Sequence, residues 1–208
     1  VNLIVTRSVR AVLLALTGSR LAGAPRTEDT ARYYQHLSRL SAAFTILSDT
    51  AMGTLGGSLK RREKISGRLA DALAYLFLAS AALKRYHDEA KTTANHALVR
   101  WSVELCLYRT QEAILGVLEN LPTRPAAWLL GWLIFPLGAR FRPPADRIGT
   151  RVARDILEDR QTRHDLTADV FIPAGDQPGL GMLEAALDKA VAALPVETKL
   201  RDAVRAGT

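Results

Sequence analysis

Apolar positions recur every three or four residues over long stretches of the first 121 residues. In residues 30–55 the recurring positions are Tyr33, Leu37, Leu40, Phe44, Leu47 and Ala51. In residues 63–89 they are Ile65, Leu69, Leu73, Leu76, Leu83 and Tyr86. These spacings place the side chains along one face of an α-helix. The pattern therefore predicts two amphipathic helices, with Gly56 and Gly57 ending the first.

A third helix is predicted over residues 95–120. Its apolar stripe is Leu98, Trp101, Leu105, Tyr108 and Leu115, widened by Val103, Leu107, Ile114 and Leu118. Short links between the three helices favour antiparallel neighbours. Residues 72–83 of the second helix carry no charge, so we expect that helix to be buried on several sides. This run is too short to span a bilayer, which takes ~20 residues.

The pattern changes after residue 121, where prolines become frequent. Residues 126–139 carry no charge and include Trp128, Trp132 and Phe135. We expect an apolar helical hairpin over residues 122–144. A helix is predicted over 145–158, an irregular polar stretch over 163–178, and a helical pair over 180–193 and 196–206, broken at Pro195.

No segment alternates as a strand would, and no repeat has a fixed period. The predicted fold class is all-α: an antiparallel helical bundle with a Pro/Trp-rich helical hairpin and C-terminal helices. Four segments are expected: an N-terminal helical segment or linker (1–29), a three-helix core (30–121), the hairpin (122–144) and a C-terminal helical extension (145–208). The apolar run 11–16 resembles a secretory signal, but its shortness and the nearby Arg20 favour a short buried helix.

The formal net charge is +7, from 28 Lys and Arg against 21 Asp and Glu. This excess favours anionic partners such as lipid headgroups or phosphates. The basic cluster at residues 60–64 is expected to be a solvated turn, with contact to phosphate or acidic lipid as the alternative. No nucleic-acid-binding motif surrounds the cluster, so nucleic acid is not an expected partner.

None of the residue sets that carry catalysis is complete in the sequence. The histidines share no helical face, and we expect no metal site and surface or cap roles for His36, His87, His96 and His164. The single cysteine, Cys106, is expected to be a small buried hydrophobe. Three carboxylates interrupt apolar helices: Asp49, Asp71 and Glu104. They are expected to form interhelical ion pairs with nearby Arg68 and Arg100, with a catalytic base as the alternative.

The segment with Trp128, Trp132 and Phe135 is the candidate contact site. Arginines flank it at Arg124, Arg140 and Arg142. Tryptophan prefers the zone between lipid headgroups and acyl chains, and flanking arginines favour anionic lipid. A membrane or partner contact is therefore one interpretation. The other is a hairpin packed on the bundle, with the tryptophans filling the core.

Seven runs of the sequence, in order along the chain, point to a known family. They are RYYQHLSRLSA (32–42), LGGSLKRREKISGRLAD (55–71), LFLASAALKRY (76–86), LVRW (98–101), IFPLG (134–138), PADR (144–147) and GMLEAAL (181–187). These runs resemble the C-terminal region of long bacterial acyl-CoA dehydrogenases of the FadE type. The resemblance covers nearly the whole chain and is best over residues 27–194.

The resemblance implies a flavoenzyme of fatty-acid β-oxidation that uses FAD to remove hydrogens from the α and β carbons of a fatty acyl-CoA. The family's flavin-binding and catalytic regions lie upstream of the matching segment. It therefore implies FAD in the full-length enzyme, none in this chain alone, and no activity of this chain by itself. The family's catalytic carboxylate has no counterpart here, so no catalytic, cofactor-binding or metal residue is assigned.

Because the first residue is Val1 and the family continues past the last, we expect a piece of a longer protein. The expected role is an accessory domain that packs on the upstream catalytic domains, forms a homo-oligomer, or docks peripherally on the inner face of the cytoplasmic membrane. The expected location is the cytoplasm. The alternatives are a non-catalytic interaction or oligomerisation scaffold and a small self-sufficient enzyme.

Overall fold

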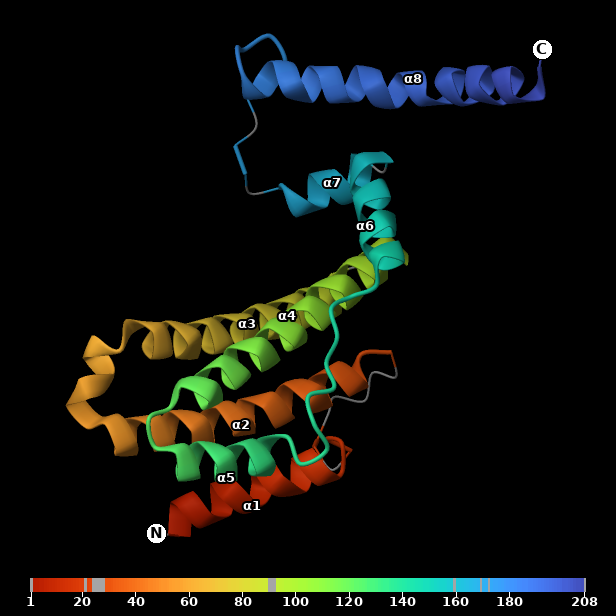
Figure 1. Cartoon of the computed structure of the whole chain (residues 1–208). Helices are drawn as coiled ribbons and strands as arrows, with labels where there is room; N and C mark the ends of the chain where they lie inside the picture. Colours follow the sequence, from red (N-terminus) through yellow and green to blue (C-terminus); the bar gives the residue numbers. More distant parts are fainter. Residues whose placement is uncertain are drawn as a thin grey trace. The chain divides into compact units, whose positions relative to one another are not determined.

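The computed structural model describes residues 2–20, 22–23, 29–89, 93–158, 160–168, 170–171 and 173–207. Over these residues the chain is helical and contains no strand (Figure 1), which confirms the all-α class. The chain divides into two compact units, residues 1–149 and residues 150–208.

Successive helices of the first unit run in alternating directions along the chain, which confirms the antiparallel bundle (Figure 1). They are α1 (Asn2–Leu16), α2 (Ala31–Leu55), α3 (Glu63–Asp88), α4 (Thr93–Asn120) and α5 (Arg124–Ile134), with a 3₁₀ turn, η1 (Gly56–Arg61), before α3. The three predicted core helices are α2, α3 and α4. The predicted stop at the end of α2 is also confirmed, since Gly56 has φ 49° and donates its N–H to the Met52 carbonyl.

α3 and α4 lie side by side, and α2 lies between this pair and the helices α1 and α5 (Figure 1). The core around them is continuous from α2 to α5. Its largest fully buried aliphatic side chains include Leu40, Leu47, Leu83, Ile114, Leu121 and Ile134. Burial of each such side chain stabilises the fold by ~1.5–3 kcal/mol. In α1, Ala11, Leu14 and Ala15 are buried as well, which agrees with the predicted short buried helix.

The five central positions of the predicted apolar stripe of α4 are not its core face, whereas the four residues predicted to widen the stripe, Val103, Leu107, Ile114 and Leu118, are buried in the core. The half-buried positions are Leu98, Trp101, Leu105, Tyr108 and Leu115. The buried positions include Val99, Val103, Leu107, Thr110, Ile114 and Val117. Because α4 contacts α2, α3 and α5, apolar residues occupy most of its circumference and the periodicity does not single out one face. Thr110 is tolerated in the core because its hydroxyl donates to the Cys106 carbonyl at 2.8 Å.

The predicted hairpin over residues 122–144 is one helix, α5, followed by a segment without helix up to α6 (Asp146–Glu158). Pro136, Pro143 and Pro144 explain the difference. Each lacks a backbone N–H, and each disfavours the helical conformation of the residue before it.

The second unit contains α7 (Arg160–Leu166) and α8 (Leu180–Ala206). α7 begins a helix where the chain was expected to become irregular. α8 replaces the predicted helical pair and continues through Pro195. A proline inside a helix removes one backbone hydrogen bond, and the alanine-rich turn before it favours helix strongly enough to keep the helix intact. The Arg163 Nη2 and Asp188 Oδ1 atoms, 3.2 Å apart, join α7 to α8.

One side-chain amide attaches the segment after α5 to α4. The Gln111 Nε2 donates to the Phe141 carbonyl, and the Phe141 N–H donates to the Gln111 Oε1, both at 3.0 Å. Gln111 is only 4% exposed, so these bonds form largely away from water. The pair of bonds fixes the position of Phe141 and of its neighbour Arg140.

We expect Gln111→Leu to lower the free energy of unfolding of the first unit by ~2–3 kcal/mol, because two backbone groups of Phe141 lose their partners. Urea unfolding followed by circular dichroism measures the change. Gln177→Leu, at an exposed glutamine of the second unit, is the control and should change stability by less than ~0.5 kcal/mol. Equal midpoints for the two variants would contradict the structural role of Gln111.

Candidate functional site

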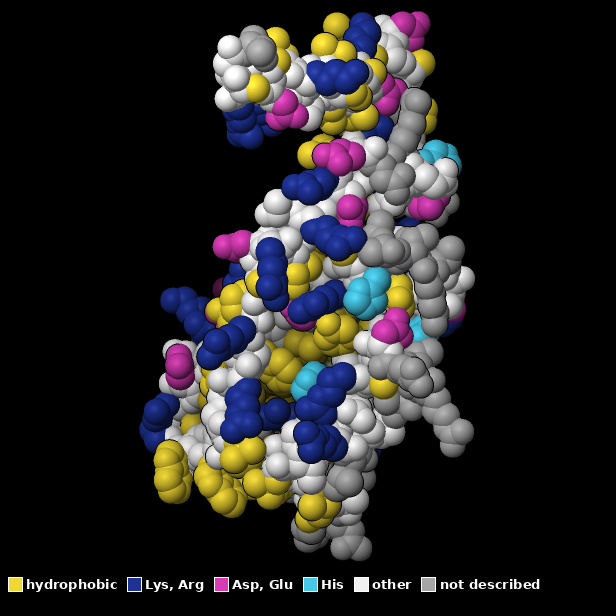
Figure 2. Space-filling view, turned by 90° about the vertical axis from the view of Figure 1, so that its right-hand side faces the viewer, with side chains coloured by type: hydrophobic (Ala, Val, Ile, Leu, Met, Phe, Trp, Pro, Cys, Tyr) yellow, Lys and Arg dark blue, Asp and Glu magenta, His cyan; other side chains and the backbone are white. Residues whose placement is uncertain are grey.

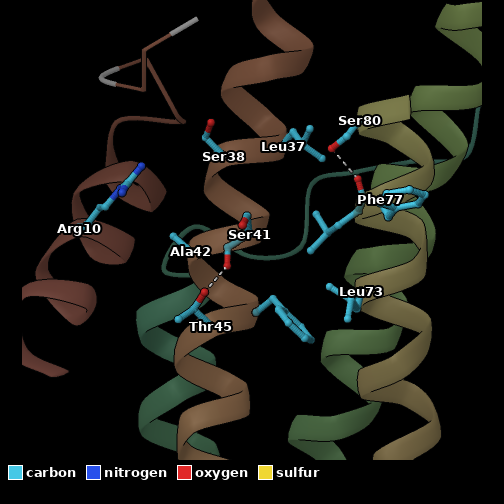
Figure 3. A pocket seen from close by; sticks show the side chains of 11 residues that line it. Arg10, Leu37, Ser38, Ser41, Ala42, Thr45, Leu73, Phe77 and Ser80 are labelled. Atoms are coloured by element: carbon cyan, nitrogen blue, oxygen red, sulfur yellow. Dashed lines mark hydrogen bonds between the residues drawn. The ribbon is translucent and has the colours of Figure 1, made fainter. Parts of the chain in front are cut away.

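A groove of about 590 Å³ lies between α2 and α3, with Arg10 of α1 also lining it (Figure 3). Its apolar residues include Leu37, Phe44, Leu73, Leu76 and Phe77. Two of its hydroxyls are bound within their own helices: Thr45 donates to the Ser41 carbonyl and Ser80 to the Leu76 carbonyl, both at 2.9 Å. No described residue lining the groove is a carboxylate, an imidazole or a thiol. The groove is therefore suited to contact with an apolar surface and not to acid–base chemistry.

The prediction that α3 is buried on several sides is wrong. Leu73 is 55% exposed, Phe77 71% and Leu78 51%, whereas Leu76 and Leu83 are buried. Only one side of α3 is covered within the described residues. By length and apolar composition α3 could also cross a membrane. The core helix of a soluble protein can have the same length and composition, so these properties alone do not distinguish the two.

α5 carries a second apolar surface, which we call the tryptophan face: Trp128, Leu129 and Trp132. These side chains are 81%, 52% and 60% exposed. The opposite side of α5 is buried through Ala127, Leu130 and Ile134. The tryptophans therefore do not fill the core, and that interpretation of the segment is wrong.

The other residues of the predicted contact site lie in different places. Phe135 is a core residue, 8% exposed, and is not part of the tryptophan face. Arg124 is four residues before Trp128, so the two share a side of α5; its Nη1 also donates to the Glu119 carbonyl at 2.7 Å. Arg142 is exposed, and Arg140 lines a separate pocket.

This pocket, the arginine pocket, has a volume of about 160 Å³. It is lined by Ala15, Gly18, Arg32, His36, Arg39, Leu137, Arg140 and Phe141. Arg39 is 7% exposed. Its Nη2 donates to the Ile134 carbonyl at 3.3 Å, and its buried Nε has no hydrogen-bond partner. The Arg39 guanidinium carbon lies 5.8 Å from the centre of the Phe141 ring, which offsets part of the cost of burying the charge.

Positive charge dominates the electrostatics of this pocket. Burial lowers the pKa of Arg39, and the charges of Arg140 and Arg32 lower it further. Burial, with Arg32 and Arg39, also lowers the pKa of His36 to about 4, so its ring is neutral at pH 7. The His36 ring meets the Phe141 ring edge-on, with centroids 5.1 Å apart. Figure 2 shows Lys and Arg side chains gathered around a hydrophobic hollow on the face that it presents.

Of the carboxylates that interrupt the helices, Glu104 has a structural pairing and Asp71 lies at the surface. Glu104 pairs with Arg100 within α4, at 2.9 Å between Oε1 and Nε, so the expected interhelical ion pair is intrahelical. The Tyr33 hydroxyl of α2 also donates to Glu104 at 3.2 Å, and burial together with this carboxylate raises the pKa of Tyr33 to about 12. Asp71 is exposed.

The other features singled out in the sequence, which are Cys106, the possible metal ligands and the basic turn, form no reactive site in the part of the chain that the structure describes. Cys106 is buried, and burial raises the pKa of its thiol, in agreement with the predicted small hydrophobe. Among the described residues, no group of three His, Cys, Asp or Glu side chains could hold a metal ion. The basic turn over residues 60–64 is exposed.

The arginine pocket was not predicted from the sequence. Its signal was present, because Arg32, His36 and Arg39 are separated by four and three residues and so share one side of α2. Several basic residues on one side of a helix, with no carboxylate among them, form the sequence pattern that would have indicated this pocket. The contribution of Arg140, about a hundred residues later in the sequence, had no such signal.

No solved structure matches this chain. A family model does match it, that of the bacterial-type C-terminal domain of acyl-CoA dehydrogenase, over residues 1–208. The all-helical fold without a catalytic constellation in its described residues is consistent with a C-terminal domain of this kind. Because the match extends over the whole chain, the chain belongs to the family of bacterial-type acyl-CoA dehydrogenase C-terminal domains.

Proposed function

We propose that this chain is a non-catalytic domain that docks onto the catalytic part of an FAD-dependent acyl-CoA dehydrogenase of fatty-acid β-oxidation. The observation that carries the proposal is the uncovered side of α3, where Leu73 and Phe77 border the groove and are more than half exposed. Family membership supplies the dehydrogenase context. The exposed apolar groove is the physical reason to expect a second protein surface that covers it.

Soluble monomers rarely expose large contiguous apolar patches. Covering side chains such as Leu73, Phe77 and Leu78 stabilises a complex by up to ~1.5–3 kcal/mol each. The upstream catalytic domains are the proposed partner, and a second copy of the chain is the alternative. Thr45 and Ser80 at the groove donate within their own helices, so they leave the surface mainly apolar.

Neither of the two cavities described above offers the groups that FAD-dependent dehydrogenation needs. The arginine pocket, at about 160 Å³, is below the ~300–1,000 Å³ of sites that enclose a whole organic ligand. The groove is lined by hydrocarbon, hydroxyl groups and Arg10, none of which could transfer a proton from an acyl-CoA at neutral pH. We therefore assign binding of FAD and acyl-CoA to the upstream domains, and no reaction step to this chain.

In the enzyme that joins this chain to its catalytic domains, Leu73→Ser combined with Phe77→Ser is expected to expose α3. Loss of ~3 kcal/mol of apolar contact weakens docking by roughly a hundredfold. Hydrogen–deuterium exchange of residues 69–84 measures the docking directly. Both side chains are exposed in this chain, so its own fold should be retained.

Leu200→Ser, at a leucine of α8 that is 66% exposed, is the matched control and should leave exchange in α3 unchanged. Exchange of α3 that is as fast in the unmodified enzyme as in the isolated chain would contradict docking. Sedimentation velocity of the isolated chain distinguishes the alternative partner. Self-association abolished by the double substitution would identify a second copy of the chain.

The tryptophan face supports a second role, peripheral docking on anionic lipid at the inner face of the cytoplasmic membrane. Arg124, Trp128 and Trp132 are spaced four residues apart and share one side of α5. Indole rings favour the headgroup zone, and arginine favours anionic lipid. Since long-chain acyl-CoA is amphipathic, docking at a lipid surface would shorten the path of the substrate to the enzyme.

We expect Trp128→Ala combined with Trp132→Ala to weaken binding to vesicles that contain anionic phospholipid by roughly tenfold or more, because each ring contributes ~1 kcal/mol when partly buried in lipid. Co-sedimentation with the vesicles measures the binding. Phe171→Ala is the control, since Phe171 is as exposed as Trp128, at 81%, and lies outside α5. Equal binding by the double variant and the unmodified chain would remove the membrane role.

A further inference from the structure

The arginine pocket brings together three guanidinium groups from two parts of the first unit. Arg32 and Arg39 come from α2, and Arg140 comes from the segment after α5. No carboxylate among the described residues forms an ion pair with any of the three within 4.0 Å. Since buried charges are normally paired, a counter-ion from outside the described chain is the missing element.

We propose that the arginine pocket is a binding site for a phosphate-type oxyanion, with Arg39 as its buried ligand and Arg32 and Arg140 as its solvent-exposed ligands. Phosphate matches the planar guanidinium fork, which donates two parallel hydrogen bonds to it. The same residues line no part of the groove or of the tryptophan face. The site is therefore independent of the docking roles.

Arg39 lacks the full set of hydrogen-bond partners and the counter-charge that a buried guanidinium normally has. It is more than nine-tenths buried, and its Nε has no hydrogen-bond partner. Its one hydrogen bond, to the Ile134 carbonyl, is long at 3.3 Å. A bound oxyanion in the pocket that Arg39 lines would supply the missing negative charge.

The two exposed arginines keep donors available. Arg32 Nη1 donates to the Gln35 Oε1 at 3.0 Å, and Arg140 Nε donates to the Leu137 carbonyl at 3.1 Å. These bonds orient each side chain and leave the remaining guanidinium N–H groups for a ligand. Gln111 fixes Phe141 beside them, so the pocket has a largely ordered wall.

The neutral His36 ring agrees with such a site. Its neighbours in the pocket are the cations Arg32, Arg39 and Arg140, and its Nδ1 lies 3.5 Å from the Ser19 hydroxyl. Burial is the main cause that lowers the pKa of this ring to about 4, and the charges of Arg32 and Arg39 lower it further. A bound oxyanion would offset the contribution of the two arginines. The pKa of His36 therefore reports on occupancy of the pocket.

The size of the pocket limits the ligand to its charged end. A volume of about 160 Å³ suits a phosphate group and not a whole nucleotide. Free phosphate, a phosphate group of coenzyme A and a phospholipid headgroup share this chemistry. The experiment below tests each of these three ligands separately.

The test titrates the 208-residue chain by calorimetry with inorganic phosphate, with coenzyme A, and with vesicles of phosphatidylcholine and phosphatidic acid, each at constant ionic strength. We expect Arg32→Gln and Arg140→Gln each to weaken binding by roughly tenfold or more, the contribution of one charge-assisted contact. Both residues are exposed, so the fold should persist. Arg142→Gln, at an exposed arginine that does not line the pocket, should bind as the unmodified chain does.

The arm that binds identifies the source of the phosphate. Binding of inorganic phosphate indicates a free-ion site, and binding of coenzyme A alone indicates a coenzyme subsite. Because the tryptophan face is also proposed to bind anionic lipid, binding of vesicles alone indicates a headgroup site in the pocket only if Arg140→Gln weakens it in the chain that carries Trp128→Ala and Trp132→Ala. In the unmodified chain, the binding ligand should also raise the pKa of His36, followed by NMR of its ring. Absence of binding in all three arms, or equal binding by the Arg140→Gln and Arg142→Gln variants, would overturn the proposal.

Discussion

Burial of α3 on one side only is the constraint on which the rest of the first unit depends. Leu76 and Leu83 pack into the core, while Leu73 and Phe77 remain in water. α2, α4 and α5 complete the core around the covered side. The groove is the surface that this arrangement leaves open. Since apolar surface gains free energy whenever it leaves water, the same helix that stabilises the domain also favours a partner.

The electrostatic properties follow from the same packing. Gln111 holds Phe141, and Phe141 lies over the guanidinium of Arg39. Arg39 is thereby held in a place where water no longer screens its charge fully, so its interaction with an anion is stronger than that of an exposed arginine. The net charge of +7 favours anions in general. The arginine pocket is the specific site at which we propose that an anion binds.

The three candidate surfaces involve largely separate elements. The groove belongs mainly to α2 and α3, the tryptophan face to α5, and the arginine pocket to one side of α2 and the segment over residues 137–141. None of them presents the groups that a dehydrogenation needs. The role proposed for the chain, binding and positioning, therefore rests on these surfaces and not on the helical fold alone.

The sequence by itself determined the helices of the bundle, because spacings of three and four residues decide locally which side chains share a face. It also determined the end of α2, since Gly56 adopts a positive φ that other residues disfavour. Only the tertiary structure decided which side of α4 is the core and which side of α3 stays open. Apolar residues surround both helices, so the neighbours and not the period select the buried side. In the same way, the sequence makes Arg39 a surface arginine like any other, and contact with Phe141 and Arg140, far along the chain, makes it part of a pocket.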